Sequence, residues 1–134
     1  MGYKLGKKSL SNLKGVHPDL VKVVKRAIEL TECDFTVIEG LRTKERQAQL
    51  LKEKKTTTMN SRHLIGHAVD LAAWVIPEGS DKGTVSWDWK YYYIIEKAVK
   101  QAAQELKIPI EWGGDWKTFK DAPHWQLPFN QYPK

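Results

Sequence analysis

The chain has 134 residues, of which 41% are hydrophobic, enough to bury one core of ordinary size but too few for two full domains. We therefore expect a single domain over residues 1–134. The lone Cys33 excludes an internal disulfide and a zinc site built on cysteine pairs, so any metal site must use histidine and carboxylate. No apolar run is long enough for a secretory signal or a membrane-spanning helix, which predicts synthesis in a cytoplasm.

The net charge of +6 is concentrated in the first half of the chain. Residues 1–60 contain 13 Lys and Arg against 7 Asp and Glu, whereas residues 61–134 contain 9 of each. A basic face there would favour an anionic partner such as nucleic acid, a membrane surface or an acidic polymer. Solvated helix faces explain the same charge equally well. Charge alone therefore does not separate these classes.

The first predicted helix begins near Pro18, which suits the first turn of a helix. His17, just before it, is interpreted as a structural residue at the helix start. The apolar residues that follow fall on one helical face, at Leu20, Val23, Val24, Ala27 and Ile28.

A strand and a second helix are expected next. The short β-branched segment at 34–41 predicts a strand that ends near Gly40. Thr43 can cap a helix over 44–54, which gives way to a polar loop.

The segment at 67–74 alternates small and larger apolar side chains. It predicts a strand in which Val69 and Leu71 face the core while Asp70 faces away. A long helix is expected to begin at Asp88. Its apolar stripe is predicted to comprise Tyr91, Ile94, Ile95, Ala98, Ala102 and Leu106.

The tail carries two strand-like pieces, at 110–116 and 124–129. Helices combined with short strands predict an α+β fold, in which a small antiparallel sheet packs with about three helices.

Two histidines lie four residues apart in the segment SRHLIGHAVD. His63 and His67 would share one face of a helix, as in the HExxH zinc proteases. However, Leu64 stands where that motif has its glutamate, and Gly66 weakens a helix. The sequence therefore argues against this version of a metal site.

A second arrangement takes His63 from a loop, Asp70 from a strand and His124 from the tail. Three such ligands leave the fourth tetrahedral position of Zn²⁺ open, which is the layout of a catalytic site. Asp121, three residues before His124, could take a proton from water and pass it to a leaving amine. These four residues could equally be scattered through core and surface, so at this point both interpretations stand.

The pattern SxHxxGxAxD, followed at a distance by acid-x-x-His, resembles the signature of a family of single-zinc peptidases. The family comprises D-Ala-D-Ala carboxypeptidases, vancomycin-resistance dipeptidases and bacteriophage L-alanyl-D-glutamate endopeptidases. The similarity to the phage branch extends through YKLGKKS, HPDLVKVVKRAIEL, DFTVIEGLRT and EWGGDWKTFKDAPHWQL. The pattern is formed here by Ser61, His63, Gly66, Ala68 and Asp70, with Asp121 and His124.

The resemblance implies one Zn²⁺ ion held by His63, Asp70 and His124, with Asp121 as the catalytic acid and base. It also implies that Arg42 polarises the scissile carbonyl and stabilises the oxyanion. The alternative for Arg42 is an ordinary surface arginine at a helix start.

Other residues near the expected site are assigned by position. Ser61 matches a family serine that contacts substrate, or it is a loop serine bonded to its own backbone. Trp112 is assigned to substrate binding, and Trp116 and Trp125 could line the same groove, although aromatic residues at this density are more often core. His67 falls at a variable position and is expected at a pocket edge or exposed.

The resemblance implies a monomeric phage endolysin that cuts the L-Ala-D-Glu bond of the peptidoglycan stem peptide and lyses the host. No separate cell-wall-binding domain is expected. A holin would have to open the inner membrane before the protein reached the wall in the periplasm. The alternatives are a D-Ala-D-Ala carboxypeptidase on the same site and a non-catalytic peptidoglycan-binding module. A nucleic-acid partner is not expected, because no recognition motif accompanies the charge.

Overall fold

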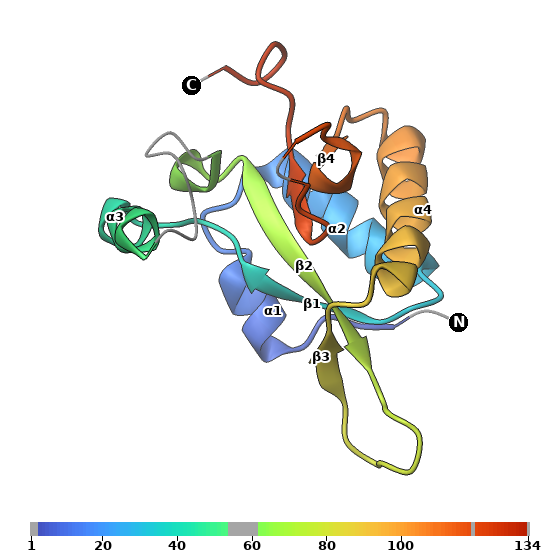
Figure 1. The fold of residues 1–134 in the computed structure, drawn as a ribbon. Helices are drawn as coiled ribbons and strands as arrows, with labels where there is room; N and C mark the ends of the chain where they lie inside the picture. Colours follow the sequence, from blue (N-terminus) through green and yellow to red (C-terminus); the bar gives the residue numbers. More distant parts are fainter. Residues whose placement is uncertain (1–2, 54–61, 119, 134) are drawn as a thin grey trace.

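The computed structural model describes residues 3–53, 62–118 and 120–133. The described residues form four α-helices, two short 3-10 helices and a five-stranded sheet (Figure 1). In chain order the elements are α1 (Lys7–Asn12), α2 (Pro18–Leu30), β1 (Phe35–Glu39), α3 (Lys44–Lys52), η1 (Arg62–Ile65), β2 (Ala68–Val75), β3 (Thr84–Ser86), α4 (Trp89–Leu106), β4 (Glu111–Trp112), η2 (Gly113–Asp115) and β5 (His124–Gln126).

The sheet has the strand order β1-β2-β5-β4, and β3 pairs with the far end of β2. Each of the strand pairs is antiparallel. Figure 1 shows β2 running through the middle of the molecule, with the β2–β3 hairpin extending away from the helices. The predicted α+β class with a small antiparallel sheet is therefore confirmed.

The two faces of the sheet have different surroundings, because side chains alternate along each strand. Val69 and Leu71 are fully buried in the core that the sheet shares with α2 and α4. Asp70, between them, is the one charged residue of β2 and faces the opposite side, where it pairs with His124. We call that opposite side the site face. The predicted orientation of these three residues is confirmed.

Helix α2 buries the face that its periodicity predicts. The five apolar residues predicted for this face are all buried. His17 caps the helix: its Nδ1 accepts a hydrogen bond from the backbone N–H of Asp19 at 3.1 Å. The structural role expected for His17 is therefore confirmed.

The stripe predicted for α4 is partly wrong. Ile94 and Leu106 are 37% and 38% exposed, and Tyr92 is buried in place of Tyr91. The Tyr92 hydroxyl donates to the Ser86 carbonyl at 2.7 Å and accepts from the Ala73 N–H at 3.1 Å. These bonds satisfy the buried hydroxyl of Tyr92, and the buried residues of the helix are Tyr92, Ile95, Ala98, Val99, Ala102 and Ala103.

Helix α1, which the sequence did not predict, covers the free edge of β1. The Ser9 hydroxyl accepts from the Val37 N–H at 3.0 Å, and the Asn12 amide donates to the Val37 carbonyl at 2.8 Å. An exposed strand edge offers unpaired backbone groups to other chains. Two polar side chains of α1 therefore take the place of a further strand.

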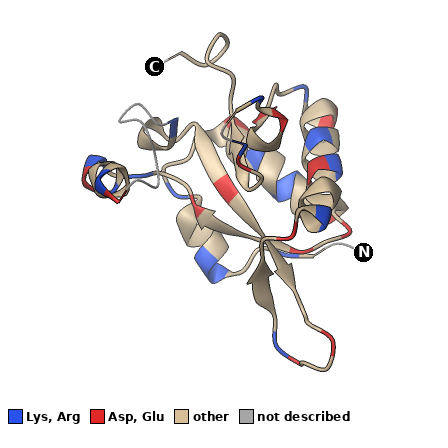
Figure 2. Cartoon of the chain, in the orientation of Figure 1, with Lys and Arg blue, Asp and Glu red and all other residues tan. Residues whose placement is uncertain are grey.

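Charged residues are spread over several helices. Figure 2 shows basic segments on α1, α3 and α4, with acidic segments among them on α3 and α4. This distribution favours solvated helix faces over one basic face. Among the described residues, no helix combines the length and the apolar composition that a membrane crossing requires.

Candidate metal centre

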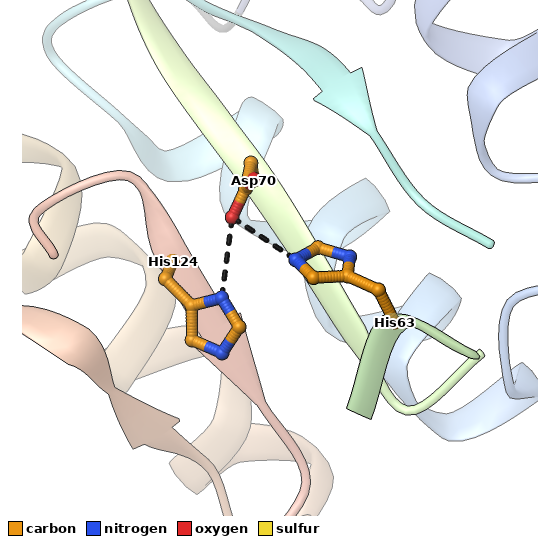
Figure 3. A group of neighbouring side chains, drawn as sticks. All are labelled: His63, Asp70 and His124. Carbon is orange, nitrogen blue, oxygen red and sulfur yellow. Dashed lines mark hydrogen bonds and ion pairs between the residues drawn. The ribbon is translucent and has the colours of Figure 1, made fainter. Parts of the chain in front are cut away.

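His63, Asp70 and His124 point toward one another on the site face of the sheet (Figure 3). Asp70 Oδ1 lies 3.3 Å from His63 Nε2 and 3.2 Å from His124 Nδ1. The three ligand atoms all lie within 4.8 Å of one another. The structure therefore brings together the three residues that the sequence assigns to a metal.

Pairing between strands accounts for two of the three positions. Asp70 on β2 is the direct partner of His124 on β5, and directly paired residues project on the same face of a sheet. His63 comes from η1, and the chain turns between η1 and β2 at Gly66, which has a φ of +74°. A side chain at Gly66 would be strained and would also collide with the Gly15 carbonyl.

The outer nitrogen of each imidazole has a partner of its own. His63 Nδ1 lies 2.9 Å from the Gly40 carbonyl oxygen, and His124 Nε2 lies 2.7 Å from Gln126 Oε1. A carbonyl oxygen can only accept, so His63 Nδ1 carries a proton and Nε2 is the nitrogen that faces Asp70. Such outer partners orient histidine ligands in metal sites.

The electrostatics of the cluster favour an ionised Asp70. Burial alone would raise the pKa of this carboxyl, but hydrogen bonds from His124 and His63 hold its pKa well below the usual range. Burial opposes the charged form of His124, yet the hydrogen bond to Asp70 raises the pKa of this imidazole. Two imidazoles and an ionised carboxylate are the donor set of a three-ligand zinc site, so the cluster could hold a metal ion.

Arg42 lies beside this cluster and is held in place by three hydrogen bonds. Its Nε and Nη2 donate to the two carboxylate oxygens of Glu39, each at 2.7 Å, and its Nη1 donates to Gln47 Oε1 at 2.8 Å. Nη2 also lies 3.9 Å from Asp70 Oδ2. The arginine is therefore a fixed cation next to the ligands rather than a free surface side chain.

A bulge in β1 brings Glu39 to this position. The register runs from Val37 opposite Leu71 to Glu39 opposite Asp70, so one residue is skipped on β1 alone. A bulge of this kind turns the following side chain to the other face. Without it, Glu39 would share the core face with Val37.

Asp121 lies at the start of a turn that leads into His124. Its carbonyl accepts from the His124 N–H at 3.1 Å, and its own N–H donates to the Gly113 carbonyl at 3.0 Å. Burial, and after it the negative charge of Asp70, raise the pKa of the Asp121 carboxyl. A carboxyl with a raised pKa beside a candidate metal-binding cluster has the property that a general acid and base needs.

Gly113 allows this turn to pack against η2. A Cβ at Gly113 would overlap the Asp121 carbonyl oxygen and press on the His124 Cβ at 3.0 Å. Glycine at position 113 is therefore required by the close packing of the turn that carries Asp121 and His124.

The assignment of Trp112 to substrate binding is contradicted by its burial. The residue is 3% exposed, stacks on Trp125 in the core, and donates its indole N–H to the Ala122 carbonyl at 2.6 Å. Strand alternation explains the error, because Trp112 pairs directly with Trp125 on the core face. Trp116 is half-buried, with its ring 5.1 Å from that of His124. Ser61 lies outside the described residues.

His67 belongs to a different cluster. It is half-buried, with its ring 5.3 Å from that of His17 and its Nδ1 3.3 Å from Arg62 Nη2. Burial, and after it the charge of Arg62, lower the pKa of His67. The structure thus separates His67 from the candidate metal ligands.

Sequence reasoning missed the outer residues of the centre, namely Glu39, Gln47, Gln126 and Glu111. Gln126 could have been found, because it lies two residues after His124 on a strand and so shares its face. The face on which Glu39 lies depends on the bulge, for which the sequence carries no signal.

An aspartate and a histidine on an antiparallel sheet, joined by a second histidine from a neighbouring turn of helix and with a second carboxyl alongside, are typical of metal-dependent hydrolases. The chain belongs to the phage L-alanyl-D-glutamate peptidase family, whose family model matches residues 1–126.

Individual relatives agree with this membership. The L-alanyl-D-glutamate peptidase of Escherichia phage T5 is 34% identical over 125 residues, which cover 90% of this chain and 87% of the relative. The L-alanyl-D-glutamate peptidase of Listeria phage A118 is 31% identical over 93% of this chain, which spans 42% of that longer protein. The crystal structure of the Serratia marcescens L-Ala D-Glu endopeptidase ChiX superposes with a TM-score of 0.85 at 48% identity, covering 96% of this chain and 92% of ChiX.

Proposed function

We propose that the chain is a zinc-dependent endopeptidase that hydrolyses the L-Ala-D-Glu bond in the stem peptide of peptidoglycan. The observation that carries this proposal is the convergence of His63, Asp70 and His124 on one point in a chain of this peptidase family. Named relatives with this activity, in phages and in bacteria, support the choice of bond.

Zinc is the metal that the donor set fits best, since two imidazoles and one carboxylate form a common catalytic zinc site. In such a site zinc acts as a Lewis acid toward a carbonyl oxygen and makes water a stronger acid near neutral pH. His63, Asp70 and His124 would hold the ion. Their outer hydrogen bonds keep both imidazoles aimed at Asp70 before the ion binds.

Asp121 would move the proton in this reaction. In its ionised form the carboxylate takes a proton from the attacking water, and it then gives that proton to the amine of the leaving D-Glu residue. The raised pKa of Asp121 supports both steps, because a stronger base also becomes a useful acid near neutral pH.

Arg42 would stabilise the negative charge that develops on the scissile carbonyl oxygen. Its location next to Asp70 and its three hydrogen bonds to Glu39 and Gln47 support this role. A cation that is already in position stabilises a transition state without reorganising during the reaction.

Substrate contacts would come from groups at the rim of the centre. Trp116 suits this role because its ring is half-buried beside His124. Ser61 remains a candidate on the strength of the sequence pattern.

Mass spectrometry of products from purified Gram-negative peptidoglycan tests the proposal. The samples are the wild-type protein, the Asp121→Ala variant, chelated protein and chelated protein restored with Zn²⁺. New D-Glu amino termini are expected only with the wild-type and restored samples. Release of terminal D-Ala alone would move the assignment to a carboxypeptidase, and no release from the zinc-loaded protein would reject a peptidase acting on this polymer.

The biological role that we propose is lysis of a bacterial host by a monomeric enzyme that a holin releases to the periplasm. The phage relatives support the lytic role. Expression in Escherichia coli with and without a co-expressed holin tests it. Rapid lysis is expected only when the holin is present, and equally fast lysis in its absence would contradict the dependence on release.

A further inference from the structure

A hydrogen-bonded chain extends outward from His124 across the last two strands. His124 Nε2 lies 2.7 Å from Gln126 Oε1, and Gln126 Nε2 donates to Glu111 Oε2 at 3.3 Å. Gln126 follows His124 by two residues on β5, and Glu111 on β4 is its direct cross-strand partner. The three side chains therefore share the site face by strand geometry alone.

The carboxylate of Glu111 fixes which way the Gln126 amide points. An ionised carboxylate only accepts hydrogen bonds, so the NH₂ group of Gln126 must face Glu111. The Gln126 carbonyl oxygen is then left facing His124, where it too can only accept. Glu111 therefore sets the orientation of this amide, whereas His124 alone would leave it undetermined, because an imidazole nitrogen can either donate or accept.

The amide orientation in turn determines the tautomer of His124. Because Gln126 Oε1 accepts, His124 Nε2 must carry a proton, and Nδ1 is the nitrogen whose lone pair is available to a metal. His63 reaches the opposite arrangement, since its Nδ1 donates to the Gly40 carbonyl and its Nε2 faces Asp70. The two histidines therefore present different nitrogens to the same point.

We propose that Gln126 and Glu111 are positioning residues that hold His124 in the tautomer that binds metal through Nδ1. This inference rests on the proposed zinc site and extends it to residues beyond the ligands. Outer partners of metal-bound histidines typically change metal affinity by about 10-fold to 100-fold when they are removed. We expect a loss of Zn²⁺ affinity in this range when the hydrogen-bonded chain from His124 to Glu111 is broken at Gln126.

The test measures Zn²⁺ affinity by competition with a fluorescent chelator, in parallel with ¹⁵N NMR of the His124 ring in the zinc-loaded protein. Gln126→Leu should weaken Zn²⁺ binding about 10-fold to 100-fold. Gln101→Leu is the matched control, because Gln101 donates to Glu105 at 3.2 Å in an exposed pair on α4. The control should bind Zn²⁺ as the wild type does.

A charge swap separates positioning from loss of packing. Gln126→Glu alone places two carboxylates against each other and should bind Zn²⁺ more weakly than the swap. In the double variant Glu111→Gln with Gln126→Glu, the new amide donates to the new carboxylate, which still accepts from His124 Nε2. The double variant should therefore recover an affinity within about threefold of the wild type. A merely structural role for Gln126 predicts no such recovery.

The NMR readout decides the tautomer directly. The expected wild-type spectrum has a proton on His124 Nε2 and the metal-dependent shift on Nδ1. A metal-dependent shift on Nε2, or a Gln126→Leu variant with Zn²⁺ affinity within twofold of the wild type, would overturn the proposal. Failure of the wild-type protein to bind Zn²⁺ at all would instead reject the zinc site itself.

Discussion

Glu39 and Arg42 form a two-point ion pair in which both carboxylate oxygens accept from the guanidinium, at 2.7 Å each. The pair lies on the site face only because a bulge in β1 turns Glu39 toward Asp70. Its planar geometry fixes the orientation of Arg42, because two parallel bonds allow less rotation than one. The cation that we assign to the oxyanion thus depends on a residue outside the candidate ligand set.

Glu39→Gln should lower kcat/KM about tenfold, since a neutral amide cannot accept both N–H groups and Arg42 is then less firmly held. Steady-state hydrolysis of a stem-peptide substrate measures this. Zinc content should stay at the wild-type level, because no ligand is changed. Glu29→Gln, which removes the exposed partner of Arg26 on α2, is the control. An activity within twofold of the wild type would contradict the positioning role of Glu39.

The fall of kcat/KM on the acidic side of the pH profile should reflect protonation of Asp121. Burial and the charge of Asp70 raise its pKa, so the fall of kcat/KM with decreasing pH should begin above the usual range of an aspartate. Above that pKa the ionised carboxylate can take the proton from water, and below it the base is lost. Asp121→Asn should reduce kcat/KM by about 10²-fold to 10⁴-fold and remove this fall. Bound zinc is measured at each pH, and a fall that persists in the variant while zinc stays bound would reject the assignment.

Zinc binding should release protons near neutral pH. The hydrogen bond to Asp70 raises the pKa of His124, so part of the metal-free protein carries an imidazolium that must lose a proton before it can bind the ion. Zinc affinity should therefore increase as pH rises through this pKa. Calorimetric titrations in two buffers with different ionisation enthalpies count the protons released. Identical binding enthalpies in the two buffers would show that no proton is displaced.

Arg62 should contribute strongly to stability by tying the tail of the chain to the segment that carries His63. Its Nη2 donates to the carbonyls of Leu127 at 2.9 Å and Tyr132 at 2.7 Å, and the side chain is buried. Arg62→Met would leave both carbonyls without this donor, and we expect the free energy of unfolding to fall by about 2–4 kcal/mol. Urea denaturation measures the loss. Arg26→Met, at an exposed arginine of α2, is the control and should leave the free energy of unfolding close to that of the wild type.

The parts of this protein that the sequence predicts are those encoded by local periodicity and by close spacing. The face of α2 and the inward pair Val69 and Leu71 follow from helical and strand periods. The candidate ligands His63 and Asp70 lie within one short motif, and His124 is a candidate from its place in the tail, which the family pattern supports. Long, strongly periodic segments and dense motifs carry their information within a few residues.

The rest depends on contacts between distant segments. Helix α1 and strand β3 span six and three residues, too short for a period to emerge. Trp112 and Trp116 are both aromatic residues near the centre, and only the pairing of β4 with β5 decides that the first faces the core. The partners of the Tyr92 hydroxyl, at Ala73 and Ser86, likewise come from other segments, so the sequence of α4 alone does not show that Tyr92 is buried.

The pairing of Asp70 with His124 joins residues 54 positions apart, on strands that are neighbours in the sheet but far apart along the chain. A ribosome must therefore translate past β5 before the centre can exist, because a domain folds only once its distant partners are available. Nascent chains that carry β2 but not β5 would display Asp70 without His124. The three candidate ligands can therefore meet only after β5 has been synthesised, so the centre forms late relative to β2 and η1.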